Sequence, residues 1–145
     1  MLYVTIGRDL LGLSPLYVED PANGYTVMKV GPGARTMRLE HATSPVSDGS
    51  VLTGATADLQ QARLVIRVHG ATTGDVLARL GVVEQALNQW AYNVTIVIDG
   101  VTEVWRCQPA NHSRGLSGTY EAEHLKGGWQ DLTVELPKQP AAYGY

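Results

Sequence analysis

The clearest hydrophobic pattern in the chain is an alternation of apolar and polar residues over residues 61–69, QARLVIRVH. Successive side chains of a β-strand point to opposite faces of the sheet, so alternation is typical of a strand with one buried face. The apolar positions are Ala62, Leu64, Ile66 and Val68. We therefore expect a half-buried strand here, with its polar residues facing outward.

The pattern changes from strand to helix directly after this run. Thr72 is followed three residues later by Asp75, an acidic variant of the capping box that begins many helices. Helical spacing of the apolar residues then predicts one amphipathic helix over about residues 73–90. We expect its apolar stripe to lie in the core: Val76, Leu77, Leu80, Val83, Leu87 and Trp90.

Shorter strand patterns lie in the first third of the chain. Residues 2–6 (LYVTI) and 25–30 (YTVMKV) are rich in β-branched and aromatic residues. The sequence GPGA at residues 31–34 separates the second of these runs from residues 36–41 (TMRLEH), which predicts a hairpin. Residues 42–57 are nearly uncharged and predict a long loop, a feature that is often functional or docked on a partner.

The second half of the chain carries two further predicted strand pairs. Residues 94–108 (VTIVIDGVTEVWRCQ) contain Asp99-Gly100, a pair that tolerates the positive φ angles of a type I′ hairpin turn. Residues 119–125 and 131–137 predict another pair of strands around Gly127 and Gly128. About seven or eight strands and one helix predict a mainly β (α+β) fold, a sandwich or split barrel with the helix laid across it.

Composition and charge narrow the class of protein. A chain of 145 residues fits a single domain, 1–145, and 44% apolar residues are enough for a folded core. Charged residues make up only 17%, which favours subunit contacts over a fully solvated surface. A net charge of −3 argues against a domain that grips nucleic acid by its phosphates. No run of about 18 apolar residues occurs, so we expect no membrane anchor.

Catalytic and metal-binding chemistry is not indicated by any motif. His69 precedes Gly70 at the junction of strand and helix, but no nucleophile or carboxylate signature accompanies it, and we interpret the pair as the turn towards the Thr72 cap. The histidines and the single cysteine lack the spacing of a zinc site: His41, His69, His112, His124 and Cys107. We therefore predict no catalytic residue, no metal and no cofactor.

The acidic pairs and the tryptophans are the remaining candidates for a catalytic or ligand-binding site. Glu19 with Asp20, and Glu121 with Glu123, are interpreted as charged surface positions rather than as an acid and base pair. The tryptophans could stack on a sugar, since aromatic rings with a polar group are common at binding surfaces: Trp90, Trp105 and Trp129. A β-sandwich module that binds a carbohydrate or another ligand through Trp105 or Trp129 and the 42–57 loop is therefore the alternative function.

The order of these segments resembles a known family. Residues 47–54 (SDGSVLTG), 62–70 (ARLVIRVHG) and 72–90 (TTGDVLARLGVVEQALNQW), followed by a hairpin, are similar to the N-terminal domain of distal tail proteins. These and related minor tail proteins belong to long-tailed, non-contractile bacteriophages. The resemblance covers about residues 40–108, with an Asp-Gly pair at Asp48 and Gly49 and a strand that begins at Arg63.

The resemblance implies a tail-tube-like split β-barrel that assembles as a ring, typically a hexamer. Such a ring joins the tail tube to the tail tip or baseplate hub and leaves a channel through which DNA passes as cargo. It implies a structural, non-enzymatic part of the virion that is made in the host cytoplasm and whose partners are its own copies and other tail proteins. A tail-tube subunit or another tail-tip protein of the same fold remains an alternative.

Two segments are the expected contacts in such a ring. The loop 42–57 would dock on a neighbouring subunit, and its expected interface residues are Ser47, Asp48, Gly49, Ser50, Val51 and Leu52. A C-terminal arm, residues 137–145, would either dock on a neighbour or fray. Many distal tail proteins carry a second, C-terminal β-sandwich domain, whereas this chain ends at Tyr145, so we expect the adaptor role rather than host-surface binding.

Overall fold

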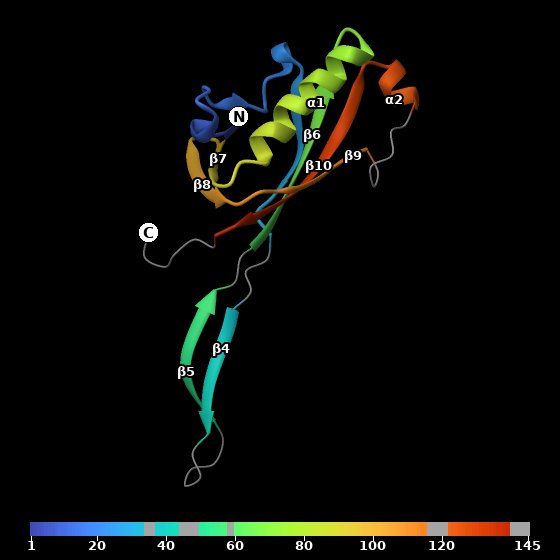
Figure 1. Cartoon of the computed structure of the whole chain (residues 1–145). Coiled ribbons are helices and arrows are strands. Elements are labelled where there is room, and N and C mark those ends of the chain that lie inside the picture. The colour runs from blue at the N-terminus through green and yellow to red at the C-terminus, as the bar shows by residue number, and fades with distance from the viewer. Residues whose placement is uncertain (34–36, 44–49, 58–59, 116–121, 140–145) are drawn as a thin grey trace.

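The computed structural model describes residues 1–33, 37–43, 50–57, 60–115 and 122–139 (Figure 1). In chain order the elements are β1 (Leu2–Ile6), η1 (Asp9–Leu11), β2 (Leu16–Tyr17), η2 (Pro21–Asn23), β3 (Tyr25–Gly31), β4 (Met37–Thr43), β5 (Ser50–Ala57), β6 (Gln60–His69), α1 (Thr73–Leu87), β7 (Tyr92–Ile98), β8 (Val101–Cys107), β9 (Asn111–Arg114), α2 (Ala122–Lys126) and β10 (Trp129–Lys138). The prediction of a mainly β fold with one long helix is confirmed.

The main sheet has eight strands, and its order is β2-β1-β7-β8-β10-β6-β3, with β9 also paired to β10. Every pairing in it is antiparallel. One half consists of β2, β1, β7 and β8, and the other of β9, β10, β6 and β3. The two halves meet where β8 touches β10, at the single register pair Cys107↔Lys138.

The segment between β2 and β3 connects the two halves on their far side. The Val18 N–H donates to the Val4 carbonyl oxygen at 3.0 Å, and Asp20 exchanges backbone hydrogen bonds with Tyr25 at 2.9 and 3.1 Å. Residues 18–20 thus bond to β1 and to β3 in turn. The sheet therefore curls around the core in the manner of a split barrel.

A single core fills the space between the halves and the helix α1. Inward residues of β6 are fully buried, as the alternating pattern predicts, and α1 lies across the sheet (Figure 1). The helix contributes side chains at the predicted spacing: Val76, Leu80, Val83 and Leu87 are buried, and Leu77 is partly buried against the core. The sheet halves and α1 are therefore held together by one hydrophobic cluster.

Trp90 is a correction to the predicted apolar stripe. Its side chain is 83% exposed, because α1 ends at Leu87 rather than at residue 90. Beyond Asn88, which ends the helix, the chain turns towards β7 and Trp90 is no longer in phase with the buried side of α1. Helical spacing therefore does not apply to this residue.

The junction between β6 and α1 is built as the sequence predicts. The Thr72 side chain accepts a hydrogen bond from the Asp75 N–H at 3.2 Å, which is the expected N-cap. A Cβ added to Gly70 would lie 2.8 Å from the Asp75 Cβ and 2.9 Å from the Val76 nitrogen. Gly70 is therefore needed because the first turn of the helix packs directly against it.

The predicted hairpin between residues 25–30 and 36–41 is wrong. β3 pairs with β6, and β4 pairs with β5. Continued from Gly31↔Arg63 at one residue per step, the β3–β6 register reaches Met37↔Ala57, which is the observed β4–β5 pairing. The two pairings thus share one register, and β4 is not folded back on β3.

The structure differs from the sequence prediction in two other segments, residues 50–57 and 119–125, and agrees with it at the Asp99-Gly100 turn. Residues 50–57, expected within a long loop, form β5. Of the predicted strand 119–125, residues 122–125 lie in the short helix α2. The turn at Asp99-Gly100 is as predicted, with φ of 49° and 83° at the two residues.

Candidate assembly surface

The hairpin formed by β4 and β5 is the first candidate for subunit contact. Figure 1 shows it extending away from the main sheet, and neither strand pairs with any other described strand. Two-stranded hairpins are marginally stable in water, so such an element gains stability when a partner covers it. Of the expected interface residues, Ser50, Val51 and Leu52 begin β5, opposite Thr43, Ala42 and His41. Ser47, Asp48 and Gly49 lie outside the described residues.

The outer side of the β2-β1-β7-β8 half is the second candidate. Register places Tyr17, Thr5, Thr95 and Val104 side by side across the four strands, and Tyr3, Val97 and Thr102 form the next row. We call these seven residues the uncharged face. Its larger side chains are open to solvent: Tyr17 is 57%, Tyr3 48% and Val104 52% exposed. An exposed sheet face of this composition is typical of a surface that another molecule covers.

The outer side of the other half is charged, and its charges are paired with one another. Arg67 forms two hydrogen bonds with Asp131, at 2.8 and 3.2 Å, and Arg63 lies 3.8 Å from Glu135. The Arg67 guanidinium also lies 3.9 Å from the centre of the Trp129 ring. A hollow of about 330 Å³ opens beside these residues. These paired charges contrast with the seven residues of the uncharged face, beside which the exposed Arg106 lies opposite Asn93.

The candidate histidines are dispersed over the fold. His69 ends β6 and is exposed, and His41 lies in β4. The His112 ring bonds to Asn88 Oδ1 at 2.9 Å and lies 3.2 Å from Glu84 Oε2, while the His124 ring stacks on Trp129 at 3.9 Å. In the part of the chain that the structure describes, no three His, Cys, Asp or Glu side chains gather as a metal site.

The three tryptophans do not form one stacking platform. Trp105 is 2% exposed, its Nε1–H donates to Glu103 at 2.8 Å, and the Lys138 ammonium lies 4.9 Å from its ring centre. Trp129 contacts both Arg67 and His124. Trp90 alone presents its ring to solvent. The rings of Trp105 and Trp129, the residues proposed for sugar binding, therefore contact other side chains of the protein.

Glu19 and Asp20 each accept a local hydrogen bond. A Glu19 carboxylate oxygen accepts the Val27 N–H at 2.6 Å, and Asp20 accepts a hydrogen bond from the Asn23 side chain at 2.5 Å. Glu123 lies in α2, and Glu121 lies outside the described residues. Their hydrogen bonds are made within the β2–β3 segment and do not couple the two carboxylates to each other.

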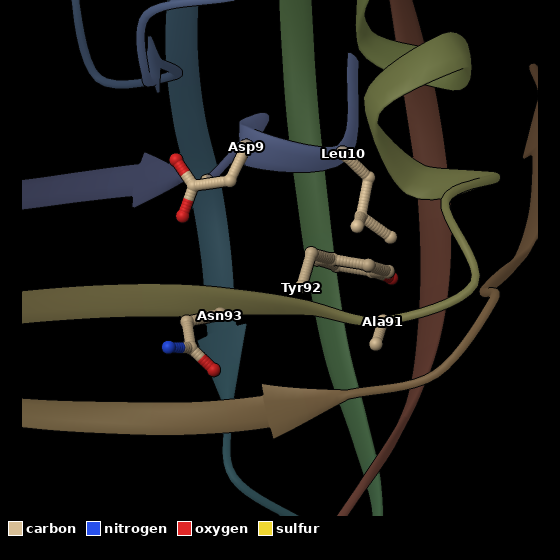
Figure 2. Close-up of a pocket in the computed structure, with 6 residues that line it drawn as sticks. Asp9, Leu10, Ala91, Tyr92 and Asn93 are labelled. Carbon is tan, nitrogen blue, oxygen red and sulfur yellow. The ribbon is translucent and has the colours of Figure 1, made fainter. Parts of the chain in front are cut away.

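A small pocket lies between η1 and the start of β7 (Figure 2). It holds about 250 Å³ and is lined by Gly7, Asp9, Leu10, Ala91, Tyr92 and Asn93. Leu10 and Ala91 lie near the Tyr92 ring, whereas Asp9 and Asn93 point away from it (Figure 2). Burial raises the pKa of the Tyr92 phenol far above its usual range, so this hydroxyl stays protonated. The lining offers neither a histidine nor a paired carboxylate to act as a base.

Comparisons with known proteins give matches in structure only. No protein family model and no curated protein matches the sequence. A chain of the phage P2 baseplate in its activated conformation with calcium superposes with a TM-score of 0.68 at 8% identity, over 94% of this chain and 43% of that chain. The Dit protein of phage SPP1 gives a TM-score of 0.54 at 16% identity, over 94% of this chain and 50% of that chain.

The chain has the fold of phage baseplate and Dit proteins. The phage p2 baseplate with strontium supports the same conclusion, with a TM-score of 0.66 at 9% identity over 95% of this chain. The resemblance to distal tail proteins found in the sequence is thereby confirmed at the level of the fold. This chain spans about half the length of these structures, 43% to 50%.

Proposed function

We propose that this chain is a structural protein of a phage tail, a ring-forming adaptor that joins the tail tube to the tail tip. The observation that carries the proposal is the superposition of 94% of the chain on a phage baseplate protein. The SPP1 Dit protein, which is described as a hub of the adsorption apparatus, has the same fold and supports this assignment. The proposed location is therefore the virion, after synthesis in the host cytoplasm.

The two candidate surfaces are what a ring of identical copies requires. In a closed ring each subunit offers two different surfaces, one to each neighbour. The β4–β5 hairpin and the expected interface residues Ser47–Leu52 would contact one neighbour, and the uncharged face would be covered on assembly. Six copies per ring and contact with the tube and the baseplate hub belong to the same proposal.

The charge and the dispersed polar residues fit a passive channel. A net charge of −3 gives passing DNA little to bind, because the phosphates are also negative. Among the described residues no three His, Cys, Asp or Glu side chains gather as a metal site. We propose no enzymatic activity, metal or cofactor. No helix in the described ranges has the length and apolar character that crossing a membrane would need.

Antibody labelling of phage particles tests whether the protein is part of the tail. It also distinguishes an adaptor at the tail tip from a subunit of the tail tube. Gold particles at a single position near the far end of the tail would identify an adaptor, whereas labelling along the whole tail would identify a tube subunit. An antibody against a known capsid protein of the same particle serves as the positional control. Particles that carry no label anywhere on the tail would contradict the proposed function.

A further inference from the structure

The β3 end of the main sheet has the longer of the two strands at which the sheet order ends. The order runs from β2 to β3, and β2 has two residues whereas β3 has seven. β3 pairs with β6 on one side, and among the described residues only Asp20 pairs its backbone with it on the other. Unpaired N–H and C=O groups on an edge strand are a template to which a strand of another molecule can add. The β3 edge therefore needs protection if the sheet is to end there.

Tyr25 shows which backbone groups of β3 point towards this edge. Its N–H and C=O both bond to Asp20, at 3.1 and 2.9 Å, on the side away from β6. These directions repeat at every second residue of an antiparallel strand, so the Val27 N–H points the same way. If the pairing of Asp20 with Tyr25 continued, Val18 would face Val27. The Val18 N–H instead donates to the Val4 carbonyl of β1, which takes Val18 away from the β3 edge.

Glu19 supplies the acceptor that this change of direction removes. One of its carboxylate oxygens accepts the Val27 N–H at 2.6 Å, and the residue is partly buried. A hydrogen bond to a charged acceptor is stronger than one between neutral groups. A strand that added at Val27 would have to break this bond and leave the carboxylate without its donor, which costs free energy. The Glu19 side chain therefore occupies the place of a strand at this point of the edge.

The remainder of β3 has other features that disfavour strand pairing. Its register against β6 shifts between Val27 and Lys29, which leaves Met28 as a bulge. Bulges twist an edge strand, and lysine side chains on an edge also disfavour pairing. Lys29 is exposed, and Pro32, just after the strand, has no N–H. These features lie beyond Val27, so at Val27 itself the protection comes from Glu19.

We propose that Glu19 blocks the β3 edge against a second copy of this chain. Without the carboxylate, the outward N–H of Val27 is available to the β3 strand of another molecule. Two identical antiparallel edges can pair about a two-fold axis, because each then offers the same surface to the other. Glu19 thus restricts where copies can join the sheet. This inference goes beyond the proposed function and holds whether or not the chain forms rings.

Sedimentation of the full chain over a range of concentrations, with matched variants at position 19, tests this role. Glu19→Ala removes the acceptor, whereas Glu19→Gln keeps an oxygen that can accept the Val27 N–H. We expect the weight-average mass of Glu19→Ala to rise with concentration to about twice that of the unmodified chain or more. The mass of Glu19→Gln should follow that of the unmodified chain. In dilute solution, amide exchange at Val27 should speed up about tenfold in Glu19→Ala only.

A second substitution shows whether association depends on the Val27 N–H. Val27→Pro removes this N–H, and proline is tolerated on an edge strand where the missing N–H faces away from the sheet. Combined with Glu19→Ala, it should return the mass to that of the unmodified chain. Slow exchange of the β10 amides, in the interior of the sheet, shows that each variant is folded. A folded Glu19→Ala chain with unchanged mass would overturn the proposal, and so would equal association of Glu19→Gln or of the double variant.

Discussion

Thr72 and Gly70 fix the point at which β6 ends and α1 begins. The Thr72 oxygen satisfies the Asp75 N–H, which would have no partner within the helix, and Gly70 leaves room for the first helical turn. His69 contributes its backbone here, since its N–H donates to the Gly24 carbonyl at 2.8 Å. The His-Gly pair therefore marks a packed junction between two elements.

Removal of the Thr72 hydroxyl gives the first prediction. Thr72→Ala should lower the free energy of unfolding by about 1 kcal/mol, because one N–H of the helix loses its acceptor. Thr72→Ser keeps an oxygen at the same position and should retain most of the stability. Urea denaturation of the three proteins measures the difference, and equal loss in both variants would rule out a capping role.

The buried side of α1 gives the second prediction. Leu80→Ala or Leu87→Ala should cost roughly 2–5 kcal/mol, since both side chains are fully buried. Val82→Ala on the same helix is the control, because Val82 is 36% exposed, and it should cost less than about 1 kcal/mol. A loss below about 1 kcal/mol at both leucines would contradict their place in the core.

Cys107 gives a prediction about pH. Burial raises the pKa of its thiol from 9.0 to about 12, with the charge of Lys138 opposing part of the rise. The folded state thus holds this proton more tightly, so the stabilisation is complete below pH 9 and is lost as the pH rises towards about 12. We expect the free energy of unfolding to fall over this range, less steeply in Cys107→Ala. Identical slopes would contradict the assignment.

At the scale of elements, the patterns of strong alternation and strong helical spacing were sufficient to predict structure. They located β6, α1 and the β7–β8 hairpin, because local turn and cap chemistry agrees with the core pattern there. The error at Trp90 arose at a helix end, where the apolar spacing continues past Leu87 although the helix does not. Only tertiary packing decides which of these residues is buried.

Apart from the β7–β8 hairpin, pairing partners could not be predicted from local sequence. The sequence of Gly31–Ala34 predicts a turn, yet β3 and β4 do not pair with each other, and their partners β6 and β5 come later in the chain. Likewise, the strand-like pattern of residues 119–125 gives way to α2. The uncharged face was also missed, because it combines short segments from four strands and appears only once the register is known.

Deletion of the β4–β5 hairpin tests the separation between folding and assembly. β3 and β6 are antiparallel neighbours, so a short glycine linker between Gly33 and Gln60 can replace residues 34–59. The shortened chain should unfold at nearly the same temperature as the full chain, because the core residues are unchanged. It should fail to form rings. Analytical ultracentrifugation measures ring formation, and rings of normal size in the shortened chain would exclude the hairpin from the interface.

At the scale of the whole molecule, the fold is shared with baseplate and Dit proteins although the identity is only 8% to 16%. The outer surface differs between the two halves: one carries the seven residues of the uncharged face, and the other carries paired charges. This asymmetry is the basis for placing neighbouring copies against one half of each subunit.

Ring formation is the central claim, and electron microscopy of the purified full chain with mass measurement tests it most directly. We predict closed rings with an open centre, and a mass that is a whole multiple of the 15.6 kDa chain, with six copies expected. A chain that stays a 15.6 kDa monomer at high concentration, and also when mixed with its tail-tube and baseplate proteins, would contradict the account.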